Sequence, residues 1–185
     1  LYLGPTVLAL SWAGATVCSH PVRRRLIALV VCGAIIGLGT HAGWEVLLNL
    51  SPSLRVLRYP VKAFFTVQFA VALLAGFAVA EIAAGPRPSL RRIAFSLLGL
   101  GGALLATPPL PSLAPQPTAW FLHGFLPGGL PPEQYARIGR LMTSDAATSG
   151  LLALLAGAIV LLAEKERLMP SRAAVAVVAL AAADL

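Results

Sequence analysis

The sequence predicts an all-α fold, a polytopic transmembrane helix bundle of about six spans with short interfacial helices on the outer face. Hydrophobic residues make up 58% of the 185 positions and charged residues only 11%, against about 45–50% and about 25% in ordinary globular domains. A soluble domain of this size cannot hide so much apolar surface, because it must cover its exterior with polar groups. The apolar runs are continuous rather than alternating, which favours helices over a membrane barrel.

Six apolar segments are candidate spans, since a spanning helix needs about 20 apolar residues. The second segment is short, but its arginines can reach the interface and extend it. Leu1 and Leu185 both end apolar runs, so we expect a single transmembrane domain, 1–185, that is an internal piece of a longer chain. The predicted spans are 1–18, 25–38, 61–84, 93–107, 147–163 and 173–185.

The positive charge follows the loops between these segments. The loops near 19–25, 85–92 and 164–172 carry nine of the 14 Lys and Arg residues, and the other two loops carry five. The positive-inside rule therefore predicts that the three richer loops are cytoplasmic. Because the cations lie in short loops and form no long basic stripe, the net charge of +7 does not indicate a nucleic-acid partner.

Two outer segments contain more than a plain loop. Residues 44–50 follow a glycine-rich break and can form a short helix at the interface, anchored by Trp44. The segment 108–146 begins with a proline-rich coil and then predicts an amphipathic surface helix that starts at Pro132. Ser144 and Asp145 then predict the N-cap of the fifth span.

The most informative segment contains Arg55, Arg58 and Lys62. It places three cations on the side of the membrane that should be poor in them. If the third span starts at Pro60, Arg58 and Lys62 flank its first turn, where cations oppose the helix dipole. One interpretation is a phosphate site at the membrane surface, since a bound anion would offset this cost. The other is headgroup anchoring by snorkelling cations.

The same region carries a resemblance to a known family. The chain resembles the later spans of YfhO-like bacterial membrane proteins and the related GT-C-type glycosyltransferase superfamily. The fairly specific block is Arg58-Tyr59-Pro60-Val61-Lys62, which matches, from the arginine onward, an element of the form Phe-Arg-Tyr/Phe-Pro-x-Lys/Arg. Supporting similarities lie at 1–5, 37–39, 44–50, 72–77 and 183–185.

The resemblance implies sugar transfer from a polyprenyl-phosphate donor on the outer face of a bacterial cytoplasmic membrane. It implies that Arg58 and Lys62, with Arg55 and Tyr59, hold the phosphate of this donor. The acidic catalytic motif of the family lies in its first outer loop, and no such motif occurs in this chain. The chain would therefore supply the scaffold and part of the donor site.

Two further residues are weaker site candidates. Glu45 can take the acceptor proton in an inverting transfer, or can simply lie on the solvated face of the interfacial helix. His123 lies among Trp120, Phe121 and Phe125. It can line an aromatic sugar or lipid cleft, or the group can be an interface anchor.

Other polar and small residues predict structure. Glu81 can pair with Arg87 near the cytoplasmic end of the third span. Ala153 and Gly157 form a small-xxx-small step that indicates close helix packing. Asp184, near the outer end of the sixth span, can cap the exit of that helix or contact an outer domain, and the sequence leaves both interpretations open.

We therefore expect part of an envelope glycan or glycolipid glycosyltransferase whose partners are membrane lipids, a lipid-linked sugar and the remaining segments of the longer chain. The alternatives are a transporter or flippase segment for a lipid-linked or anionic substrate, and a non-catalytic membrane scaffold. No CxxC and no Cys/His cluster occurs, so no metal site is expected. No cofactor is evident, and nothing supports a divalent metal.

Overall fold

The computed structural model describes residues 4–17, 21–38, 63–107 and 132–184. All six elements in these ranges are α-helices, and none of the described residues lies in a strand, which confirms the all-α class. A helix is present in each of the six apolar segments that the sequence singled out. The helices are α1 (Pro5–Val17), α2 (Val22–Leu38), α4 (Ala63–Ala83), α5 (Pro88–Leu105), α8 (Pro132–Glu164) and α9 (Pro170–Ala183).

Proline sets the start of most of these helices. Pro5, Pro88, Pro132 and Pro170 are each the first residue of a helix. The first amide of a helix has no partner within the helix, so the missing N–H of proline costs nothing at this position, and its fixed φ angle already suits the helix. The helix starts are therefore encoded locally.

The long helix α8 corrects one prediction. The sequence predicted a separate surface helix within 108–146 and a capped span from 147, whereas α8 runs without a break over 33 residues. Ser144 and Asp145 lie inside the helix, and the Ser144 carbonyl accepts a hydrogen bond from Thr148 Oγ1 at 3.1 Å. The cap interpretation is wrong: no proline lies between Pro132 and Glu164 to interrupt the helix, which continues through both residues.

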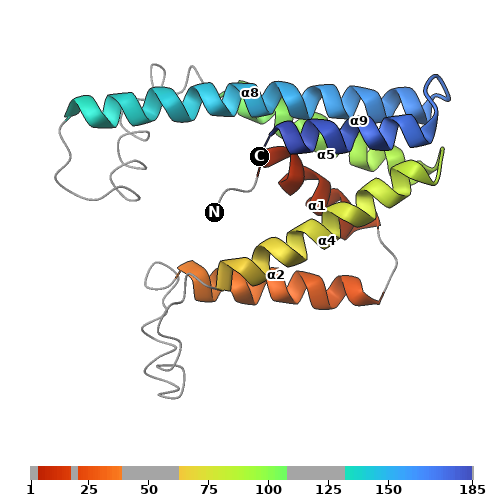
Figure 1. Ribbon diagram of the computed structural model, residues 1–185, viewed down its shortest axis with the longest axis horizontal. Coiled ribbons are helices and arrows are strands. Elements are labelled where there is room, and N and C mark those ends of the chain that lie inside the picture. The colour runs from red at the N-terminus through yellow and green to blue at the C-terminus, as the bar shows by residue number, and fades with distance from the viewer. Residues whose placement is uncertain (1–3, 18–20, 39–62, 108–131, 185) are drawn as a thin grey trace, which may run out of the picture.

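The bundle is arranged around α1 (Figure 1). This helix contacts α4, α5, α8 and α9. α5, α8 and α9 pack on one side of it, with α8 against both α5 and α9, while α2 packs on α4. α4 diverges from the α5–α8–α9 group toward the left of the view, and α2 lies below α4, apart from that group. α1 therefore joins the two groups, and α4 adds direct contacts with α9 and α5.

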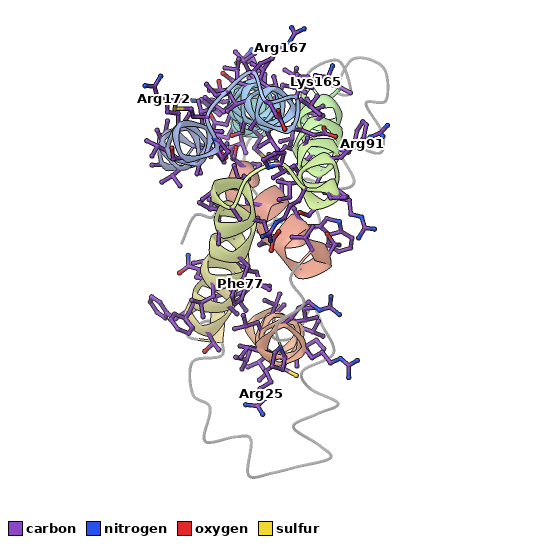
Figure 2. All side chains as sticks on the ribbon, turned by 90° about the vertical axis from the view of Figure 1, so that its right-hand side faces the viewer. Arg25, Phe77, Arg91, Lys165, Arg167 and Arg172 are labelled. Carbon is purple, nitrogen blue, oxygen red and sulfur yellow. The ribbon has the colours of Figure 1, made fainter. Side chains whose placement is uncertain are left out.

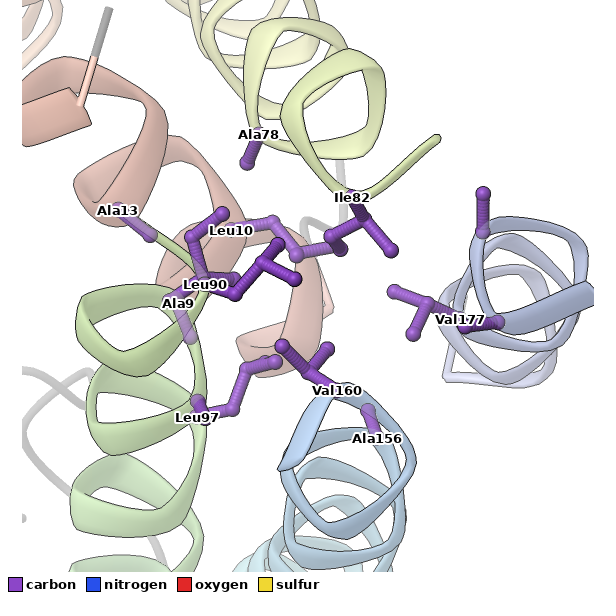
Figure 3. Packing of buried hydrophobic residues seen from close by; sticks show 14 of the residues in the cluster. Ala9, Leu10, Ala13, Ala78, Ile82, Leu90, Leu97, Ala156, Val160 and Val177 are labelled. Atoms are coloured by element: carbon purple, nitrogen blue, oxygen red, sulfur yellow. The ribbon is translucent and has the colours of Figure 1, made fainter. Parts of the chain in front are cut away.

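The core is made by side chains from five helices (Figure 3). Its fully buried members include Leu10 of α1, Ile82 of α4, Leu97 of α5, Val160 of α8 and Val177 of α9. No pair of helices encloses this cluster alone. The packing therefore depends on all five helices being present together.

Small residues let the helices approach closely. A Cβ atom added to Gly101 of α5 would lie 2.8 Å from the carbonyl oxygen of Gly150 of α8, and one added to Gly150 would lie 3.0 Å from that of Gly101. Farther along α8, Ala153 is fully buried, and a Cβ on Gly157 would meet Leu98 and the Ala94 carbonyl. The predicted Ala153/Gly157 packing step is confirmed.

Among the described residues, two helices, over Phe64–Ala83 and Arg137–Glu164, are long and apolar enough to cross a membrane. α1 and α9 are apolar but shorter. Only 39% of the most apolar window of each long helix is buried inside the bundle. Large apolar side chains also lie outside, such as Trp12 at 70% exposure and Phe69 at 62%. An exterior of this kind indicates association with a membrane.

Candidate functional site

The residues predicted to form the donor site lie outside the described residues. This holds for Arg55, Arg58, Tyr59 and Lys62, for the candidate base Glu45 and for His123. The described helices on either side of 39–62 do have a definite place. α2 ends at Leu38 and α4 begins at Ala63, and both of these termini lie toward the left of Figure 1.

Basic residues gather at the other end of the bundle, which we call the basic end. It comprises the end of α1 with the start of α2, the α4–α5 connection and the α8–α9 connection (Figure 1). Figure 2 looks directly at this end and shows Arg25, Arg91, Lys165, Arg167 and Arg172 distributed around it. The three loops that the sequence predicted to share one side of the membrane therefore meet at one end of the fold.

The α4–α5 connection is held by a small polar cluster. Ser89 Oγ donates a hydrogen bond of 3.1 Å to Glu81 Oε2, and an Arg87 guanidinium nitrogen lies 3.6 Å from the same oxygen. The predicted Glu81–Arg87 pair is confirmed. Arg91 also lies over the ring of Phe95, 5.5 Å from its centroid. These contacts hold two of the cations in place at the basic end.

The α8–α9 connection begins with a tight turn at Glu166. The Arg167 N–H donates to the Leu162 carbonyl at 3.0 Å, and the Glu166 N–H to the Ala163 carbonyl at 3.1 Å. This is the Schellman pattern, with Glu166 at the left-handed position that glycine usually occupies. Its φ angle is 57°. The turn ends α8 and directs the chain into α9.

A second polar site lies where the start of α1 meets the end of α9. The Thr6 N–H donates a buried hydrogen bond of 2.7 Å to Asp184 Oδ2. Asp184 is only 6% exposed. A carboxylate suits a helix N-terminus because it accepts from a free amide and complements the dipole. Asp184 is the C-cap residue of α9, and its carboxylate caps the start of a different helix, α1, a role that the sequence did not predict.

The surroundings of this contact are tightly fitted. A Cβ atom added to Gly4 would lie 2.7 Å from both the backbone oxygen and Oδ2 of Asp184. The hydroxyl of Thr6 is fully buried, and its Oγ1 has no hydrogen-bond partner within the part of the chain that the structure describes. One sequence signal could have pointed to this site: Gly4, which precedes α1, has no side-chain acceptor, so the first amides of α1 need another partner.

Within the described ranges, no three His, Cys, Asp or Glu side chains lie together in a way that could hold a metal ion. The chemistry that these ranges offer is of two kinds: a strongly cationic end suited to anions, and a buried carboxylate that closes the bundle. No protein-family model, curated protein or solved structure matches the chain. The functional argument therefore starts from the residues and their arrangement.

Proposed function

We propose that the chain is the membrane-embedded bundle of a GT-C-like glycosyltransferase. In this proposal all six helices lie in a bacterial cytoplasmic membrane, with the basic end cytoplasmic. The enzyme transfers a sugar from a polyprenyl-phosphate donor on the outer face, in envelope glycan or glycolipid synthesis. The observation that supports it best is that basic residues gather at one end of the bundle, whereas the end of α2 and the start of α4, which flank 39–62, are directed away from that end.

The orientation follows from the basic end. Nine of the 14 Lys and Arg residues belong to its three connections, and cytoplasmic loops are the ones enriched in such residues. A second group of cations, Arg55, Arg58 and Lys62, is then assigned to the outer side, where it needs another explanation. A phosphate ligand supplies one, because arginine can grip it through two parallel hydrogen bonds.

The proposed reaction is an inverting displacement. The bond between the anomeric carbon of the sugar and the phosphate oxygen breaks as an acceptor oxygen bonds to the same carbon. The acceptor proton passes to a carboxylate, which the family resemblance locates upstream of this chain, with Glu45 as the candidate within it. Negative charge develops on the leaving phosphate and is stabilised by Arg58 and Lys62, with Arg55 and Tyr59 beside them.

The test uses the full-length protein in membranes. Arg58→Ala and Lys62→Ala should each abolish transfer of sugar from a polyprenyl-phosphate donor while leaving membrane insertion unchanged. Arg140→Ala removes an exposed cation of α8 outside the proposed site and should retain activity. Full activity in both site variants would overturn the phosphate site. Movement of the intact lipid-linked sugar across the membrane without sugar transfer would instead favour a flippase.

A further inference from the structure

We propose that the start of α9 binds the headgroup of an anionic phospholipid, with an acyl chain of this lipid lying along the exposed face of the helix. The site is distinct from the donor site and requires no sugar transfer. It does rest on the membrane location proposed above, because only a membrane-embedded helix presents this face to lipid.

The geometry begins with a shallow groove of about 320 Å³ on α9. Its lining includes Ser171, Arg172, Val175 and Ala176. The two polar residues lie in the first turn of the helix and the two apolar residues in the next. A lipid has the same order of chemistry along its length, with a polar phosphate group followed by hydrocarbon.

The apolar part of the groove continues along the helix. Val175 is 70% exposed and Val178 is 49% exposed, while Ala173 and Val177 are buried against the bundle. Positions three or four apart share a helix face, so the outward face of α9 is a stripe of valine and alanine below Arg172. Such a stripe is unfavourable in water and favourable against an acyl chain.

The charge at this end suits an anionic rather than a neutral headgroup. The segments 21–25, 81–92 and 164–172 contain nine cations and three carboxylates. One of these carboxylates, Glu81, is already paired with Arg87. Lys165 and Arg167, in the connection that leads into α9, are exposed, and in Figure 2 Lys165 lies toward α5, on the other side of α8 from Arg172. Clusters of basic residues next to membrane helices attract anionic lipids.

Arg172 provides the specific contact with the headgroup that a general attraction between basic residues and anionic lipids lacks. Among the described residues that line the groove it is the one cation, and its guanidinium can form two parallel hydrogen bonds with phosphate oxygens. A zwitterionic headgroup carries its own cation and gains less from this environment. Free phosphate would gain the charge contact but would leave the valine stripe uncovered.

The experiment compares lipids retained by the full chain. The protein is purified in detergent with equal amounts of phosphatidylglycerol and phosphatidylcholine, and native mass spectrometry measures how much of each stays bound. We expect a preference for phosphatidylglycerol that Arg172→Gln lowers by about fivefold or more, as for loss of one hydrogen-bonded contact to a charged group. Arg172→Lys should keep part of the preference, since lysine binds phosphate as a point charge.

Arg140→Gln is the matched control. It removes the same charge from an exposed position on α8, away from the basic end, and should leave the preference unchanged. Equal losses in Arg172→Gln and Arg140→Gln would overturn the site, since they would show only an effect of net charge. Removal of bound phosphatidylglycerol by inorganic phosphate, but not by chloride at the same ionic strength, would also overturn it, because the ligand would then be free phosphate.

Failure of this proposal is distinguishable from failure of the proposed function. Resistance to alkaline carbonate extraction measures membrane insertion, and transfer from the polyprenyl-phosphate donor measures activity. An inserted, active protein without lipid preference would overturn the lipid site alone. An inserted protein that keeps the preference but transfers no sugar would contradict the glycosyltransferase alone. Extraction of the chain by carbonate would overturn both.

Discussion

Thr6 and Asp184 lie at opposite ends of the chain and are joined by a buried hydrogen bond of 2.7 Å from the Thr6 amide to the Asp184 carboxylate. The contact links the first residues of α1 to the residue that follows α9. It places a negative charge at the start of the central helix, where free amides and the helix dipole favour it. The bundle is thereby closed by a polar contact in addition to its apolar core.

The first prediction concerns this contact. Asp184→Ala should lower the free energy of unfolding by about 1–2 kcal/mol, since it removes a buried cap from α1. Asp184→Asn should retain most of the stability because the amide oxygen can accept the same bond. Thermal unfolding in detergent, followed by circular dichroism, measures both. Asp145→Ala, at an exposed position of α8, should have little effect, and an equal loss there would contradict the capping role.

The second prediction concerns the α5–α8 crossing. Gly101→Ala should destabilise the protein by about 1–3 kcal/mol, because its Cβ would lie 2.8 Å from the Gly150 carbonyl and force the helices apart. The neighbouring Gly102 provides the control, since a Cβ there meets no described residue within 4 Å. Gly102→Ala should raise stability by up to about 1 kcal/mol through helix propensity. If the denaturation midpoints of Gly101→Ala and Gly102→Ala shift in the same direction, the close contact between α5 and α8 at Gly101 is contradicted.

The third prediction concerns the turn after α8. Glu166→Gly should stabilise the protein by about 1 kcal/mol, because residue 166 has a φ angle of 57° and glycine adopts this conformation without the Cβ clash. Glu164→Gly removes the same charge from the last residue of α8 and should destabilise by about the same amount. The sign of the shift in melting temperature separates the two variants. A lower melting temperature for Glu166→Gly would count against the left-handed turn.

The fourth prediction concerns orientation in the membrane. Cysteines are introduced at Arg58, Arg91 and Arg167 after Cys18 and Cys32 are replaced by serine. Arg91 and Arg167 are exposed, unlike Leu90, which is fully buried and would give no signal. In intact cells an impermeant maleimide should label position 58 only, whereas positions 91 and 167 should react once the membrane is opened. Labelling of all three in intact cells would defeat the proposed orientation.

Much of the helical architecture could be predicted because its signals are local. Continuous apolar runs marked all six helices, and proline marked several of their starts. The Glu81–Arg87 pair was predictable for the same reason, since both residues flank one short connection. The gathering of cations at one end was also predictable, because consecutive helices that run in opposite directions place every second loop on the same side.

The misses occurred where the deciding contact is distant or where a local signal had two interpretations. Ser144 and Asp145 look like cap residues, yet inside a helix their backbone groups are already paired and the helix continues through them. The partner of Asp184 could not be read from nearby residues, because Thr6 is 178 positions away. The donor-site prediction at Arg55, Arg58, Tyr59 and Lys62 remains a prediction, since these residues lie outside the described ranges.

The link between Thr6 and Asp184 also has a consequence for biosynthesis. Ribosomes add about 5–20 residues per second, so roughly 9 to 36 seconds separate the synthesis of these two residues at the observed spacing of 178 positions. During that interval α1 has been made, but α9 and the carboxylate that follows it have not. The start of α1 must meanwhile find water, a lipid headgroup or an insertion factor as a temporary hydrogen-bond partner. Final assembly of the bundle therefore waits for the last described helix to leave the ribosome.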